Sequence, residues 1–212
     1  MISFGEEIER CLQEIRNTNN KEQNFQGQLY RYFWDKYASL GYVVEMETSI
    51  LDEHIKPEIE KMAKISGKLS NEDFKDNFAK TEMDLLIYKE DFSEIYAAEL
   101  KWIYHREHHW NPLDYLKKFK EDAEFCRELK EKARFTETCC VVVYDFDERK
   151  LIKSPRILDK KEITKEEKLL FLGGEYSLLP KGGELCEKKF EWKPLSHKTN
   201  DYQNNRYYIL KF

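Results

Sequence analysis

The sequence predicts an α/β protein built on a mixed central sheet, and three observations support this fold class. Residues 81–88 and 96–102 each alternate side chains in the manner of short, half-buried strands. Residues 138–145 are almost continuously apolar, as in a strand covered on both faces. A helical pattern over 111–134 separates the second and third of these strands, and a helical crossover of this kind favours parallel pairing.

The remaining elements follow from periodicity and turn residues. Apolar residues at three- and four-residue steps predict helices over 2–15 and 22–40, and Gly41 ends the second one. Residues 42–50 then read as a strand. The 52–80 segment, with a helix starting near Pro57, predicts an inserted helical arm. It is expected to contact substrate, mediate dimerisation or only decorate the sheet.

Length and composition indicate a single folded domain rather than a membrane protein or a disordered chain. A chain of 212 residues with 36% charged and 14% aromatic residues suits a single folded domain, residues 1–212. No apolar run approaches a membrane span, and the acidic residues 1–16 do not read as a targeting peptide. Five cysteines without a C-x-x-C spacing indicate reduced thiols, so we expect a cytoplasmic protein with no membrane partner.

Three charged residues on the first two strands are candidates for chemistry. Asp84 lies on one strand, and Glu99 and Lys101 share a face of the next because they are two residues apart. A short segment, 89–95, is expected to close a hairpin that brings Asp84 beside the other two. Charged groups on such apolar strands carry a desolvation cost unless they meet a partner or a metal.

The pattern Asp84-x(14)-Glu99-x-Lys101 resembles the PD-(D/E)xK nuclease superfamily, which has the restriction-endonuclease-like fold. The proline that often precedes the family aspartate is absent, because Met83 stands there. The resemblance covers a core of about residues 20–146 in the order αβββαβ, with the 52–80 arm inserted. It leaves 147–212 as a C-terminal extension, in which Pro180-Lys181-Gly182-Gly183 predicts a turn and residues 207–212 predict a closing strand.

The resemblance implies a magnesium site, with Mn²⁺ as the substitute ion. Asp84, Glu99, the main-chain carbonyl of Leu100 and Glu22 would hold the metal, and Lys101 would orient the attacking water. Glu22 has a second interpretation, as an acid favoured by the dipole of the helix that it begins. Asp122 matches an acidic position of relatives, and no chemistry is assigned to it.

The function implied is a metal-dependent endonuclease that hydrolyses nucleic-acid phosphodiester bonds, first of all DNA, in restriction, defence or repair. RNA substrates and a homodimer stay open. One alternative is a catalytically inactive fold of the same class that binds nucleic acid or protein. Another is an unrelated charged α/β interaction protein, in which Asp84 lies far from Glu99.

One further cluster has several interpretations. The histidines of the loop after the second strand are candidate metal ligands, candidate contacts to phosphate, or members of a solvated loop: His105, His108 and His109. No carboxylate or thiol completes a familiar zinc spacing around them.

Overall fold

The computed structural model describes residues 2–14, 22–67, 74–103, 112–144, 182–185, 188–191, 193–194 and 206–212. The helices are α1 (Phe4–Glu14), α2 (Glu22–Tyr37), α3 (Lys56–Ser66) and α4 (Pro112–Glu131), with 3₁₀ turns η1 (Ala38–Leu40) and η2 (Phe74–Asn77). The strands are β1 (Tyr42–Ser49), β2 (Glu82–Lys89), β3 (Ile95–Ile103), β4 (Glu137–Tyr144), β5 (Gly182–Leu185), β6 (Lys188–Glu191), β7 (Lys193–Pro194) and β8 (Arg206–Lys211).

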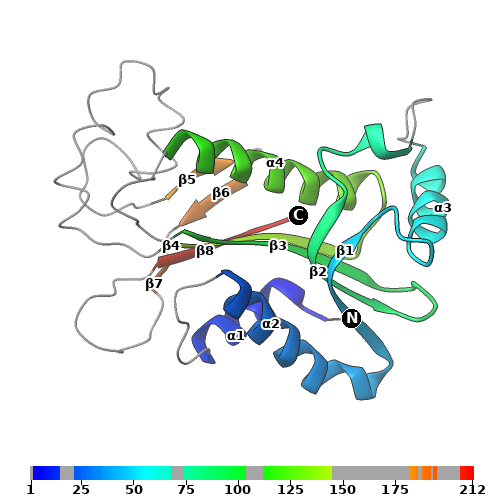
Figure 1. Cartoon of the computed structure of the whole chain (residues 1–212), viewed down its shortest axis with the longest axis horizontal. Coiled ribbons are helices and arrows are strands. Elements are labelled where there is room, and N and C mark those ends of the chain that lie inside the picture. Colours follow the sequence, from blue (N-terminus) through cyan, green and yellow to red (C-terminus); the bar gives the residue numbers. More distant parts are fainter. Residues whose placement is uncertain are drawn as a thin grey trace.

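The described chain is mixed α/β, with a six-stranded sheet in the order β1-β2-β3-β4-β8-β7 (Figure 1). β3 and β4 are parallel, as predicted from the helical crossover α4 between them, and the other neighbouring pairs are antiparallel. The expected order of helix, three strands, helix and strand is observed from α2 to β4, with α3 and η2 between β1 and β2. Among the described residues, no helix has both the length and the apolar character needed to cross a bilayer.

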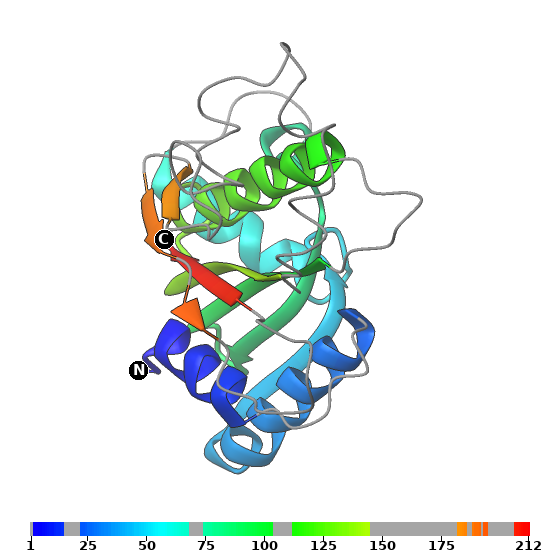
Figure 2. The ribbon, with the colours of Figure 1, turned by 90° about the vertical axis from the view of Figure 1, so that its left-hand side faces the viewer.

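Helices cover both faces of the sheet (Figure 2). On one face, α1 and α2 pack against alternate residues of the strands, including Leu85, Leu100 and Val141, which are fully buried. On the other face, α4 and the arm form a second core with Ile59, Phe125 and other apolar residues. The strands are therefore buried on two sides, which explains why a charged residue on β3 has little access to water.

Glycines with a left-handed backbone end two helical segments, η1 and α3. Gly41 has a left-handed backbone, with φ 80°, and its N–H donates to the carbonyl of Ala38, which ends η1 immediately before β1. Gly67 ends α3 in the same way, with φ 67°, and proline stands at the start of that helix. The arm thus begins with a regular helix, as the sequence predicts.

The alternation predicted for residues 81–88 places Met83 on the same face as Leu85 and Ile87, and this prediction is wrong. Leu85 and Ile87 pack toward α1 and α2, but Met83 packs in the opposite core. In the pairing of β1 with β2, Met46 lies opposite Leu85 and Thr48 lies opposite Met83. Glu47, between these two residues of β1, has a left-handed φ of 50°. The strand is irregular where Asp84 lies, so its side chains do not follow a simple period of two.

The C-terminal strands divide between two sheets. β8 pairs with β4 inside the main sheet, which confirms a strand over the last residues of the chain. β5 and β6 form a separate two-stranded sheet. The turn predicted over 180–183 is wrong at Gly182 and Gly183, because both glycines pair with β6, whereas Pro180 and Lys181 lie outside the described residues.

Candidate functional site

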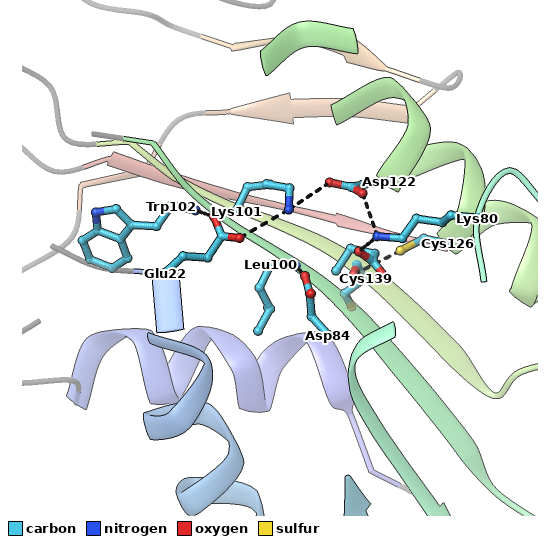
Figure 3. Close-up of polar contacts among 10 residues, drawn as sticks. Glu22, Lys80, Asp84, Leu100, Lys101, Trp102, Asp122, Cys126 and Cys139 are labelled. Atoms are coloured by element: carbon cyan, nitrogen blue, oxygen red, sulfur yellow. Dashed lines mark hydrogen bonds and ion pairs between the residues drawn. The ribbon is translucent and has the colours of Figure 1, made fainter. Parts of the chain in front are cut away.

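The β2–β3 hairpin brings Asp84 next to the candidate residues of β3. Antiparallel pairing from Leu85↔Ala98 places Asp84 beside Glu99 at the end of the ladder. The Leu100 N–H donates a hydrogen bond of 2.7 Å to Asp84 Oδ2. The expected convergence of these two strands is therefore observed, and a main-chain bond fixes the orientation of the Asp84 carboxylate (Figure 3).

Glu99 and Lys101 both face α4, whereas Leu100 between them is buried in the core beneath α1 and α2. The Glu99 residue is only 1% exposed, and Asp122 on α4 is 4% exposed. Lys101 Nζ lies 3.8 Å from Asp122 Oδ2. Asp122 thus completes a buried acidic group with Glu99, at the position where the resemblance implies an acid and where no chemistry was assigned.

Glu22 reaches the same place from the start of α2. The main-chain N–H of Trp102 donates to Glu22 Oε2 at 3.1 Å, and Lys101 Nζ lies 3.4 Å from Glu22 Oε1. Phe25, one turn further along α2, packs edge-on against the Trp102 ring. The helix start is therefore attached to β3, and Glu22 contacts Lys101 whether or not it also binds metal.

Lys80 is the member of the site that sequence reasoning missed. Its ammonium donates to Glu99 Oε2 and, at 3.0 Å, to Asp122 Oδ1, so it bridges the two most buried carboxylates. Figure 3 shows Asp122 between the ammonium groups of Lys80 and Lys101. A lysine just before a strand carries no recognisable signal, and only the folded arm brings it to Glu99.

Contacts with α4 and with Lys132, the residue after it, hold the segment that carries Lys80. The Ala79 N–H donates to Glu128 Oε2 at 2.6 Å, and Lys132 donates to the carbonyl of Asn77. Phe78 packs edge-on against Phe125, with 6.4 Å between the ring centroids. The arm therefore ends in a fixed position on α4, directly before β2.

Burial and mutual repulsion shift the protonation of the acids. Burial raises the pKa of Glu99 well above its ordinary value, repulsion from Asp84 raises it further, and Lys80 opposes the shift. Burial also raises the pKa of Asp84, although the hydrogen bond from the Leu100 N–H and the charge of Lys101 lower it in part. The site thus disfavours an additional negative charge and would gain from a cation.

Attraction to the acids keeps both lysines charged. Burial lowers the pKa of Lys80, but Glu99 and Asp122 more than offset this effect and the pKa lies above its ordinary value. Burial lowers the pKa of Lys101 as well, but the charges of Asp122, Glu22 and Asp84 outweigh this effect and raise it. Each lysine therefore acts as a fixed positive charge at neutral pH.

Two buried oxygen atoms at the site lack a hydrogen-bond donor among the described residues, namely Glu99 Oε1 and Asp122 Oδ2. Such orphaned acceptors are uncommon in protein interiors and invite an explanation. Over the same described residues, no three His, Cys, Asp or Glu side chains are arranged as a group that could hold a metal ion. The Lys80 ammonium bonds to both acids and compensates one of their two negative charges if both are ionised.

The three histidines His105, His108 and His109 lie outside the described residues, so their interpretations stay predictions. Comparisons with protein-family models, with curated proteins and with solved structures found no significant match to this chain.

Proposed function

We propose that this protein is a metal-dependent nuclease with a PD-(D/E)xK, restriction-endonuclease-like core. The observation that carries the proposal is the meeting of Asp84, Glu99 and Lys101 on two adjacent strands, with Glu22 arriving from the preceding helix. The element order from α2 to β4 supports the same core. An unrelated interaction protein with Asp84 far from Glu99 is not supported, because Asp84 bonds to the residue that follows Glu99.

The donor set suits a hard divalent cation. Carboxylate oxygens are the ligands that Mg²⁺ prefers, with Mn²⁺ as a close substitute, and one or two acids suffice to hold Mg²⁺. Four carboxylates meet two ammonium groups here, which leaves two negative charges uncompensated if all are ionised: Glu22, Asp84, Glu99, Asp122, Lys80 and Lys101. Asp84, Glu99 and the Leu100 carbonyl would hold the ion, with Glu22 at its edge. When bound, it would supply charge neutralisation for the phosphate and a lower pKa for the attacking water.

The protein's own residues have separate tasks in this proposal. Asp84 keeps its carboxylate in one orientation through the Leu100 N–H. Lys101, held between Glu22 and Asp122, has 20% of its side chain exposed and presents a positive charge at the mouth of the site. That charge orients the attacking water or offsets the charge that develops on the phosphate.

The proposed substrate is nucleic acid, with DNA as the first candidate and RNA as the second, and a homodimer is compatible with the proposal. The described cysteines Cys11, Cys126, Cys139 and Cys140 are free and buried, which supports the proposed cytoplasmic location.

A cleavage assay with plasmid DNA, single-stranded DNA and RNA, in Mg²⁺, Mn²⁺ or EDTA, tests the proposal. Asp84→Asn keeps an oxygen for the Leu100 N–H but removes the charge, and Lys101→Ala removes the ammonium. We expect each to lower Mg²⁺-dependent cleavage by about a hundredfold or more. Glu82→Gln, an exposed neighbour on β2, is the matched control and is expected to cleave like the wild type.

One observation favours the second candidate, an inactive fold that binds nucleic acid or protein. Lys80 already forms ion pairs with Glu99 and Asp122, as a purely structural lysine would. That candidate predicts no metal-dependent cleavage of any substrate and no effect of Lys101→Ala on binding to the partner. Cleavage by the wild type that Asp84→Asn does not reduce would refute our assignment of the site.

A further inference from the structure

The arm between β1 and β2 delivers a cation to the carboxylates of the site. Lys80 is the second residue before β2, and its ammonium contacts Glu99 from β3 and Asp122 from α4. These acids come from different elements, so the lysine connects the arm, the sheet and the helix at one point. It also lies over the Phe125 ring, with its Nζ 5.8 Å from the ring centroid.

Several contacts show that this position is built into the fold. Glu128 of α4 and Lys132, the residue after this helix, bind the main chain of the segment at Ala79 and Asn77, and Phe78 is buried beneath it. The main chain next to Lys80 is therefore held in place, while its side chain remains 27% exposed. The side chain can reach solvent by rotation about its own bonds, without unfolding of the arm.

We propose that Lys80 is the resident counter-cation of this site, and that a divalent cation binds at Glu99 only by displacing the Lys80 ammonium. This inference rests on the proposed metal-dependent function. Glu99 offers one oxygen to Lys80 and keeps its other oxygen without a donor among the described residues. An ion at a coordination distance of about 2.1 Å from the same carboxylate would repel an ammonium at hydrogen-bond distance.

The displacement gives the arm a function in the proposed reaction. Lys80 lowers the apparent affinity of the site for metal, because binding must overcome its ion pairs with Glu99 and Asp122. In exchange, Lys80 keeps one positive charge beside the two buried acids while no metal is bound. The arm thus sets the metal concentration at which the site is loaded.

Direct measurement of Mn²⁺ binding, by calorimetry or by electron paramagnetic resonance of the free ion, tests this competition. The measurement is made at mildly alkaline pH, where protons compete less with the metal for the acids. We expect Lys80→Met to bind Mn²⁺ about tenfold more tightly than the wild type or better, a coupling of ordinary size between competing ligands. Lys80→Arg keeps the charge and is expected to bind like the wild type.

Lys64→Met, at an exposed position of α3, removes the same charge away from the site and is expected to leave the affinity unchanged. If Lys80→Met and the wild type bind Mn²⁺ equally, and Asp84→Asn abolishes binding by both, the competition is refuted while the proposed function stands. If neither protein binds Mn²⁺, the proposed function fails and the competition with it.

A second measurement uses only the wild type, in case Lys80→Met does not fold. Acetylation of lysine side chains, read by mass spectrometry, reports how accessible each ammonium is. Saturating Mg²⁺ is expected to accelerate acetylation of Lys80 and to leave that of Lys64 unchanged. Equal acetylation of Lys80 with and without saturating Mg²⁺ would overturn the proposal.

Discussion

Replacing Glu99 by glutamine tests the electrostatics of the site without requiring any substrate. The side chain keeps its shape and an oxygen that can accept from Lys80, but it can no longer ionise. Near neutral pH the wild type must either hold a buried carboxylate close to Asp84 or keep a proton on it. The variant avoids both costs.

The sign of the effect follows from proton binding. In the unfolded chain Glu99 ionises near the ordinary pKa of 4.5, and in the folded protein its pKa is well above that value. Between these two values the folded state binds more protons, so the free energy of unfolding of the wild type falls as pH rises. The fall is at most about 1.4 kcal/mol per pH unit for this one group.

The assay is urea unfolding at a series of pH values, followed by tryptophan fluorescence, with Trp102 buried as a reporter. The quantity of interest is the free energy of unfolding of Glu99→Gln minus that of the wild type, since groups shared by both proteins cancel. This difference should rise with pH above 4.5. Below that pH it should have a constant value of roughly 1 kcal/mol, which the altered hydrogen bond to Lys80 determines. A difference that stays constant above this pH would refute the buried, repelled carboxylate.

Two other predictions concern acids that the structure fixes. Glu94→Gln should show the opposite pH dependence: burial of Glu94 is outweighed by bonds from Lys89, Tyr96 and Tyr42, which lower its pKa from 4.5 to about 2. The stability that ionised Glu94 contributes is present above pH 4.5 and lost as pH falls toward 2, so acid unfolding curves of wild type and variant should converge at low pH. Curves that stay parallel to the lowest pH would contradict this. Glu22→Gln keeps an acceptor for the Trp102 N–H, so the free energy of unfolding, measured by thermal denaturation, should change by less than about 1 kcal/mol. The rate of Mg²⁺-dependent cleavage, in contrast, should fall roughly tenfold. Unchanged cleavage would leave Glu22 with the role of attaching α2 to β3 alone.

The sequence determined much of the element order because the relevant signals are local. Alternation located β2 and β3, an apolar run located β4, and the crossover helix predicted parallel pairing of β3 with β4. The hairpin length also predicted that Asp84 and Glu99 would be neighbours. These properties depend on residues close in the chain, so composition and spacing suffice.

Local patterns failed where a contact comes from elsewhere in the fold. Met83 left its expected face because the pairing with β1 is irregular at Glu47, opposite Asp84. Asp122 entered the site only because α4 packs across β3 with that face inward. Its spacing of three residues from Phe119 and four from Cys126 places Asp122 on the buried face of α4, but this spacing does not reveal which charged groups lie opposite it.

The tertiary structure alone decided which cation the buried acids meet. Lys80 is nineteen residues from Glu99 and forty-two from Asp122 in sequence, and the arm that carries it follows no family pattern. Its place depends on the packing of Phe78 and on main-chain bonds to α4, which are long-range contacts. The sequence therefore specified the acids and the strands, while the charge balance of the site was fixed only when the arm folded onto the helix.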